Sequence, residues 1–184
     1  MSVKEILMWP EVSLSRKSHN VEKITDDVMS LVSDMTDTMR ASNGLGLAAP
    51  QIGVNKKIFV LDMEKMSLME EVEYDDDVLA VINPKIVDGF GEITIQEGCL
   101  SIPGEMFFVQ RAPFITVEYQ DVTGQINTLS ASGIVSIAIQ HEIDHLDGIL
   151  LVDNVDRERK QLILETVSSR SDEEGDLYTV YGGD

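Results

Sequence analysis

The spacing of apolar residues along the first part of the chain predicts a helix, a buried strand and an exposed loop. Between about residues 21 and 41, apolar side chains recur at helical intervals, and acidic residues gather early, where the helix dipole favours negative charge. Residues 57–63 form an apolar run typical of a buried strand. Residues 64–77 are rich in acidic side chains, so we expect them to form an exposed loop.

Short runs of β-branched and aromatic residues predict a series of strands over the middle of the chain. The pairs Asp88-Gly89 and Thr123-Gly124 are typical of turns between strands. The predicted strands cover residues 78–82, 86–87, 92–96, 106–110, 114–120 and 125–130.

A second, buried helix is predicted over residues 134–146, because this segment is long and apolar and ends at Asp147-Gly148. A short last helix is expected over residues 156–169. Helices and strands do not alternate regularly, so the predicted fold class is α+β. In it, mixed and mainly antiparallel strands pack around a central helix, with an N-terminal helix and a short C-terminal helix. We expect one domain over residues 1–170, followed by an acidic tail over residues 171–184.

Charge and cysteine content narrow the possible functions. The 184 residues include 33 acidic and 14 basic side chains, a formal net charge of −19. Such a surface repels phosphate backbones and anionic lipids, so we expect neither nucleic acid nor a membrane as a main ligand. A single cysteine, Cys99, allows no disulfide within the chain and indicates a reducing compartment. With no secretory signal and no apolar run of about 20 residues, the expected location is cytoplasmic.

The segment His141-Glu142-Ile143-Asp144-His145 is the strongest chemical signal. Residues four apart lie on one face of a helix, so both imidazoles can reach one metal ion, and Glu142 lies beside them, where it can contact a water on that ion. The segment lies in an otherwise apolar helix, where buried polar groups need partners. The alternative is a coincidental trio satisfied by hydrogen bonds.

A catalytic metal of this kind normally has three protein ligands and one position for water. No histidine follows His145, so the third histidine of the extended HExxH…H pattern is missing. Glu165 lies downstream, where a zinc metallopeptidase could place a carboxylate ligand. Cys99 is the competitor, because a preceding glycine and a following Ser-Ile-Pro indicate a shaped turn rather than core packing.

Three segments together resemble the signature motifs of the peptide deformylase family. They occur in the family's order and approximate spacing, and the likeness extends over about residues 5–165. One motif alone would be weak evidence, whereas three in register are specific. The segments are residues 44–51 (GLGLAAPQ), 97–101 (EGCLS) and 140–146 (QHEIDHL).

The resemblance implies a hydrolase that removes the formyl group from N-formylmethionyl peptides, with nascent chains as substrates. It implies that Cys99, His141 and His145 bind the metal, usually Fe²⁺ and replaceable by Zn²⁺, Ni²⁺ or Co²⁺. Such a cation lowers the pKa of a bound water from about 15.7 to about 7. Glu142 would take a proton from this water and deliver it to the leaving amine.

Further residues receive roles by the same resemblance. The side-chain amide of Gln51 and the backbone N–H of Leu100 would stabilise the oxyanion. Glu97 and Arg111 resemble an ion pair supporting the cysteine loop, and Asp144 is expected to be solvated or to support a ligand. An apolar slot for the substrate methionine is implied at Leu45, Gly46, Ile95, Ile134, Ile137 and Ala138, for which core packing is the alternative role.

Two features depart from better-known members. Asn43 and Met106 are uncharged where an acidic and a basic residue are expected, so peptide contacts near the mouth of the site should differ. A basic C-terminal helix is one way in which a deformylase docks on ribosomal RNA, but here the acidic residues 171–176 follow it. A transient ribosome contact therefore stays open.

Two rival functions remain. The first is a metallopeptidase that uses Glu165 as the third ligand. The second is a deformylase-like domain that binds peptides without catalysis, and the intact set of Gln51, Cys99 and Glu142 argues against it.

Overall fold

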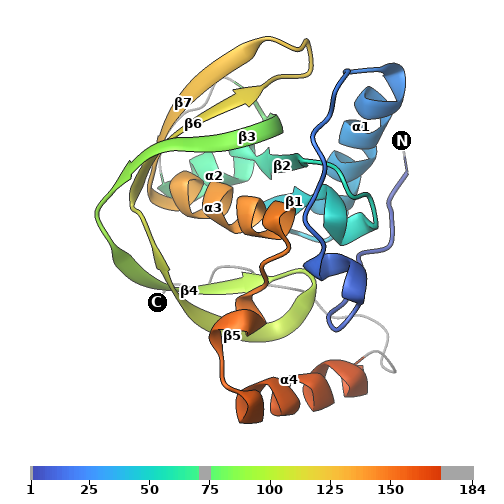
Figure 1. The fold of residues 1–184 in the computed structure, drawn as a ribbon, viewed down its shortest axis with the longest axis vertical. Coiled ribbons are helices and arrows are strands. Elements are labelled where there is room, and N and C mark those ends of the chain that lie inside the picture. The colour runs from blue at the N-terminus through green and yellow to red at the C-terminus, as the bar shows by residue number, and fades with distance from the viewer. Residues whose placement is uncertain (1, 71–75, 171–184) are drawn as a thin grey trace.

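The computed structural model describes residues 2–70 and 76–170, which form helices and antiparallel strands (Figure 1). The α-helices in these residues are α1 (Asp26–Ala41), α2 (Met63–Glu70), α3 (Gly133–Asp147) and α4 (Arg157–Arg170). The strands are β1 (Gly46–Ala48), β2 (Ile58–Asp62), β3 (Val78–Phe90), β4 (Ile93–Cys99), β5 (Ile102–Arg111), β6 (Phe114–Gln120) and β7 (Ile126–Ser132). Short 3-10 helices are η1 (Val12–Ser15), η2 (Ala49–Ile52) and η3 (Leu151–Asn154).

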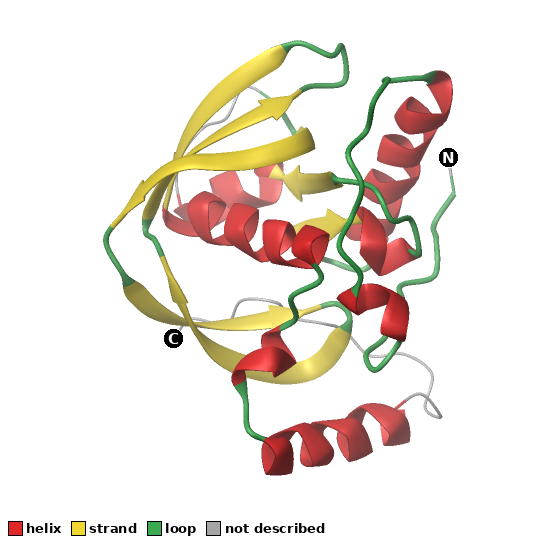
Figure 2. Ribbon diagram, in the orientation of Figure 1, coloured by secondary structure: helices red, strands yellow, loops and turns green. Residues whose placement is uncertain are grey.

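The strands form two sheets around α3. A five-stranded sheet has the order β1-β2-β3-β6-β7, and β4 pairs with β5 in a two-stranded sheet. Every strand pair is antiparallel. The strands β3, β6 and β7 curve over one side of α3, while β4 and β5 pass on its other side (Figure 2). The predicted α+β class with mainly antiparallel strands is confirmed.

Helix α3 is held by apolar packing along most of its length. Val135, Ala138, Ile139 and Leu146 are at most 2% exposed and belong to one core cluster with side chains of β2, β3 and β6. The helix ends at Gly148, whose left-handed backbone (φ 74°) lets its N–H bond back to the last helical turn. The buried face of this helix therefore places Ser136, His141, Glu142 and His145 in a water-poor environment.

The expected helix over residues 21–41 begins later than predicted, at Asp26, with Thr25 as its N-cap. The cause is a tertiary contact: the backbone of Val21 forms hydrogen bonds through both its N–H and its C=O with the side chain of Asn83. Val21 therefore packs in the core without being helical.

The prediction of a loop over residues 64–77 was wrong for its first half, which belongs to helix α2. Met63 and Met66, three positions apart, are buried in the main core cluster, so packing stabilises one face of this otherwise polar helix.

Two predicted strands, residues 78–82 and 86–87, are one continuous strand, β3, and Asp88-Gly89 lies within it rather than in a turn. Register shifts occur between Ile82 and Lys85 and between Ile86 and Asp88 in its pairing with β6. The first irregularity spans Asn83-Pro84, and the second precedes Asp88-Gly89, which pair in register with Thr116 and Ile115 of β6. The other predicted strands are present, each within a few residues of its expected bounds.

Near the C-terminus, the predicted last helix is present as α4, and its Ile163 and Val167 pack into a cluster with the residues around Cys99. The expected acidic tail, residues 171–184, lies outside the described residues. Among the residues that are described, no helix has the length and apolar character needed to cross a bilayer.

Asn83 is expected to be a stability determinant. It adopts a left-handed backbone (φ 52°), and its side chain bonds Val21 twice at 2.8 Å and Gln120 at 2.7 Å. Asn83→Ala should lower the free energy of unfolding by about 3 kcal/mol, because it removes three hydrogen bonds and strains the backbone. Chemical denaturation measures this change. Asn83→Gly should cost less, since glycine tolerates the conformation, and a loss below about 0.5 kcal/mol for alanine would contradict the assignment.

Candidate metal centre

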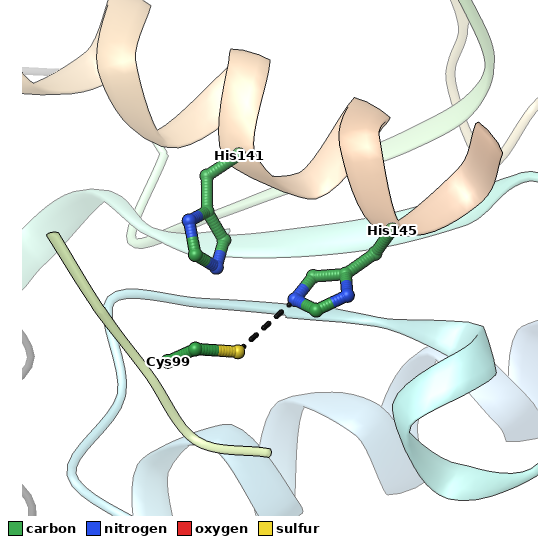
Figure 3. Close-up of side chains that lie close together, drawn as sticks. All are labelled: Cys99, His141 and His145. Atoms are coloured by element: carbon green, nitrogen blue, oxygen red, sulfur yellow. Dashed lines mark hydrogen bonds between the residues drawn. The ribbon is translucent and has the colours of Figure 1, made fainter. Parts of the chain in front are cut away.

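Three potential metal ligands converge beside α3. The side chains of Cys99, His141 and His145 each offer one donor atom, and these atoms all lie within 4.8 Å of one another. Cys99 is the last residue of β4, whereas both histidines project from consecutive turns of α3 (Figure 3). The Sγ of Cys99 lies 3.2 Å from Nε2 of His145. All three residues are at most 5% exposed.

This donor set fits a transition-metal ion. Ligand atoms at about 2.0–2.3 Å from one tetrahedral ion are separated by about 3.3–3.8 Å. Here Sγ of Cys99 and Nε2 of His145 are 3.2 Å apart, and no pair of the three donors exceeds 4.8 Å. Sulfur and imidazole donors suit zinc and iron rather than magnesium or calcium. Three protein donors leave one coordination position for solvent, as catalytic sites require.

His141 is oriented by a buried chain of charges. Its Nδ1 lies 2.8 Å from Oε2 of Glu97, and Arg111 binds both carboxylate oxygens of Glu97 at 2.6 and 2.9 Å. Arg111 also donates to Asp144 at 2.6 Å. The ion pair expected between Glu97 and Arg111 is thus present, and a carboxylate behind a ligating histidine fixes the orientation of its ring.

The protonation of Glu97 follows from these partners. Burial by itself would raise the pKa of this carboxyl group, but the hydrogen bonds from Arg111 and His141 outweigh burial and hold the pKa at about 2. Glu97 is therefore ionised, and a negative charge lies behind His141.

His145 differs from His141 in its surroundings. Burial, followed by the nearby His141, lowers the pKa of His145 well below its ordinary value, so its imidazole is neutral and able to bind a cation. Its Nδ1 is buried and has no hydrogen-bond partner among the described residues.

Glu142 lies between the two histidines in sequence and is 3% exposed. Burial raises the pKa of Glu142 to about 7, because an apolar environment disfavours the charged carboxylate. Its Oε2 is buried and has no partner within the described part of the chain. A β-carbon at Gly46 would collide with this carboxylate and with Leu61, so the glycine makes room for Glu142.

Gln51, in η2, directs its side-chain amide toward Cys99. Its Oε1 accepts a hydrogen bond from the backbone N–H of Ala48 at 2.8 Å, which directs Nε2 the other way. That Nε2 lies 3.7 Å from Sγ of Cys99 and 3.2 Å from Oγ of Ser101. Leu100 follows Cys99 in the turn after β4 and is 3% exposed. The amide of Gln51 is therefore a fixed donor beside the three ligands.

The residues expected to line the apolar slot have different environments. Leu45 and Ala138 are buried in the main core cluster, Ile134 packs against it, and Ile137 is buried. Ile95 and Gly46 are half-buried. Leu45 and Ala138 thus contribute to core packing, while the half-buried members also have exposed surface that a ligand could contact.

Glu165 is not brought to the histidines. It is exposed on α4 and accepts a hydrogen bond from Gln161, one helical turn earlier. The structure therefore gives the metallopeptidase alternative no third ligand at Glu165, whereas the donor atom of Cys99 lies within 4.8 Å of those of both histidines.

Several contacts at the site were not anticipated from the sequence. Ser101 contacts Gln51, and Lys65 donates to the backbone carbonyl and side chain of Asn43, at 2.6 and 2.7 Å, immediately before the first motif. The bond from Arg111 to Asp144 extends the charge chain along α3. Nothing in the types or spacing of these residues indicated the contacts, since each joins segments distant in sequence.

The comparisons with known proteins agree with this geometry. The family model described as polypeptide deformylase matches residues 3–161. A peptide deformylase of Thermodesulfovibrio yellowstonii is 38% identical over 162 residues, which cover 88% of this chain and 94% of that protein. A peptide deformylase of Orientia tsutsugamushi is 39% identical over 177 residues, covering 94% of this chain and 97% of the relative.

Solved structures extend the similarity to the fold. The peptide deformylase of Ehrlichia chaffeensis in complex with actinonin superposes with a TM-score of 0.84 and 37% identity, covering 95% of this chain and 100% of that one. The peptide deformylase of Thermus thermophilus gives a TM-score of 0.76 at 38% identity, covering 91% and 94%. The chain belongs to the polypeptide deformylase family, and it is a metal-dependent hydrolase that removes the N-formyl group from peptides.

Proposed function

We propose that Cys99, His141 and His145 hold the metal with which this chain releases formate from N-formylmethionyl nascent peptides. The convergence of their three donor atoms within 4.8 Å, beside a buried carboxylate and a fixed amide, is the observation that supports this most directly. The bound ion would supply a Lewis acid that lowers the pKa of a water ligand into the neutral range. All other steps fall to side chains and backbone of the chain itself.

Glu142 is the proposed proton carrier. A carboxyl group with a pKa of about 7 can take a proton from the attacking water and give it to the leaving amine at neutral pH. Gly46 keeps this carboxylate in place by the absence of a side chain.

Gln51 and Leu100 are the proposed oxyanion donors. As the carbonyl oxygen of the formyl group gains charge, the Nε2 of Gln51 and the backbone N–H of Leu100 would donate to it. Donors that are fixed before reaction stabilise this charge without reorganisation. The hydrogen bond from Ala48 to Gln51 supplies that fixation on one side.

The methionine side chain of the substrate is proposed to lie against an apolar slot. Its half-buried residues would contact the thioether, and the buried ones would form its floor. These residues are Leu45, Gly46, Ile95, Ile134, Ile137 and Ala138. The actinonin complex of the relative from Ehrlichia chaffeensis is consistent with a ligand-accessible site in this fold.

The metal, location and partners complete the proposal. We propose Fe²⁺ as the native ion, replaceable by Zn²⁺, Ni²⁺ or Co²⁺, and a reducing cytoplasm, where the thiolate of Cys99 persists and nascent chains are formed. Residues 1–170 are proposed as the catalytic domain. A ribosome contact through α4 would compete with ion pairs within the chain, because Arg159 pairs with Glu105 and Lys160 with Asp153.

The proposed metal ligands can be tested by measuring the metal content of variants. Cys99→Ala should lose most of its bound metal after dialysis, because two imidazoles alone hold an ion weakly, whereas Glu165→Gln should keep it. Elemental analysis of both purified variants gives the answer. Retention by Cys99→Ala together with release by Glu165→Gln would reverse the assignment in favour of a metallopeptidase.

The hydrolytic step can be tested with a formyl-Met peptide under anaerobic, iron-replete conditions. The unaltered protein should release formate, and Glu142→Gln should lower kcat by about 10²–10⁴-fold through loss of the proton carrier. Its metal content should stay unchanged. A protein that binds the peptide without releasing formate would instead be a non-catalytic binding domain.

The identity of the native metal can be tested by exposure to air. A ferrous thiolate site should lose activity through oxidation of the iron and of Cys99, while the nickel-substituted form should last longer. The half-lives of both forms, measured in the same buffer, decide between them. Equal half-lives would count against iron as the native ion.

A further inference from the structure

The two histidines of the metal centre are supported unequally. Nδ1 of His141 is bound by the ionised Glu97, as described above. Nδ1 of His145 points away from Cys99 (Figure 3) and has no partner among the described residues, although His145 is only 2% exposed. A ligating imidazole almost always donates its second N–H to a carboxylate, a carbonyl or a water, because that bond sets its tautomer and orientation. His145 therefore needs a partner that the protein does not supply directly.

A small cavity lies against this histidine. It has a volume of about 10 Å³ and is lined by His141, Asp144, His145, Ile149, Leu150, Leu151 and Asn154. That volume suits a single water, and such a water needs two to four polar partners. The side chains of Ile149, Leu150 and Leu151 are apolar, so any side-chain partner of this water has to come from the polar residues of the lining.

Asn154 is the remaining polar side chain of the lining, besides Asp144 and the two histidines. Asp144, which also lines the cavity, already accepts a short hydrogen bond from Arg111. Asn154, the last residue of η3, lines the cavity from an exposed position, and its side chain makes no hydrogen bond within the described residues. An amide can donate to a water and accept from it, so Asn154 can hold a water that accepts from His145.

We propose that one ordered water bridges Nδ1–H of His145 to the side chain of Asn154, which makes Asn154 a positioning residue of the metal centre. The inference rests on the proposed function, because it assumes that Nε2 of His145 binds the ion. The bridge fixes the tautomer in which Nδ1 carries the proton and Nε2 is free to coordinate. It gives His145 the support that Glu97 gives His141, with a neutral partner in place of a charged one.

The first test is a high-resolution crystal structure of the nickel-loaded protein. It should contain a solvent peak within about 3.2 Å of both Nδ1 of His145 and the amide of Asn154. An absent peak, or a direct protein partner for Nδ1, would overturn the proposal.

The second test measures the affinity of the site for nickel. Asn154→Leu, which keeps the side-chain size but removes its polar atoms, should weaken nickel binding by about 10–100-fold. Asn154→Gln should restore part of the loss. Asn20→Leu, at an exposed asparagine on the segment before α1, is the matched control and should bind nickel normally. The thermal unfolding of the metal-free variants identifies any general loss of structure.

The outcomes distinguish an error in the role of Asn154 from an error in the proposed function. If the unaltered protein binds nickel and Asn154→Leu binds it equally well, the role of Asn154 is overturned while the proposed function stands. If the unaltered protein binds no nickel at Cys99, His141 and His145, the proposed function and this inference are both overturned.

Discussion

The buried ion pair between Glu97 and Arg111 is the interaction on which the geometry of the metal centre depends. Glu97 lies on β4 two residues before Cys99, Arg111 ends β5, and the carboxylate reaches His141 on α3. One chain of charge-assisted bonds thus ties both strands of the small sheet to the helix. An ionised carboxylate that is 0% exposed is costly unless its oxygens are bonded, and here Arg111 and His141 bond both. The bonds that stabilise this pair therefore also hold β4, which ends at Cys99, beside the helix that carries the two histidines.

Burial and charged neighbours together set the pKa values of the carboxyl groups at the centre. Glu142 and Glu97 are both buried carboxylates close to His141, yet their pKa values shift in opposite directions. Glu97 has a guanidinium partner that stabilises its charge, whereas desolvation dominates at Glu142. One carboxylate is thereby a permanent anion that orients the ring of His141, and the other can exchange a proton near neutral pH. Two residues of the same chemistry obtain different roles from their neighbours alone.

Close approach of glycine backbone to neighbouring side chains also shapes the site. Gly46 allows the strand β1 to pass against the carboxylate of Glu142, and a β-carbon at Gly44 would collide with the side chain of Leu100. The first motif therefore touches both the helix and the cysteine turn. The backbone N–H of Ala48 fixes the side chain of Gln51 within the same segment. Packing of this segment therefore positions a hydrogen-bond donor and also encloses one side of the site.

The sequence by itself determined the composition of the centre and most of the secondary structure. The i, i+4 histidines on a long apolar segment, the glycine-flanked Cys99 and the strand patterns are local signals, and local spacing fixes which side chains share a helix face. Tertiary structure decided the rest. Helix α2 depends on burial of Met63 and Met66, and β3 continues through Asn-Pro and Asp-Gly because β6 pairs with it. The tertiary structure brings Cys99, rather than Glu165, next to the two histidines, and it links Arg111 to Asp144. It also leaves Nδ1 of His145 without a partner among the described residues. Each of these features depends on residues that are distant along the chain. Such contacts arise only when the sheets close around α3, so no local pattern encodes them.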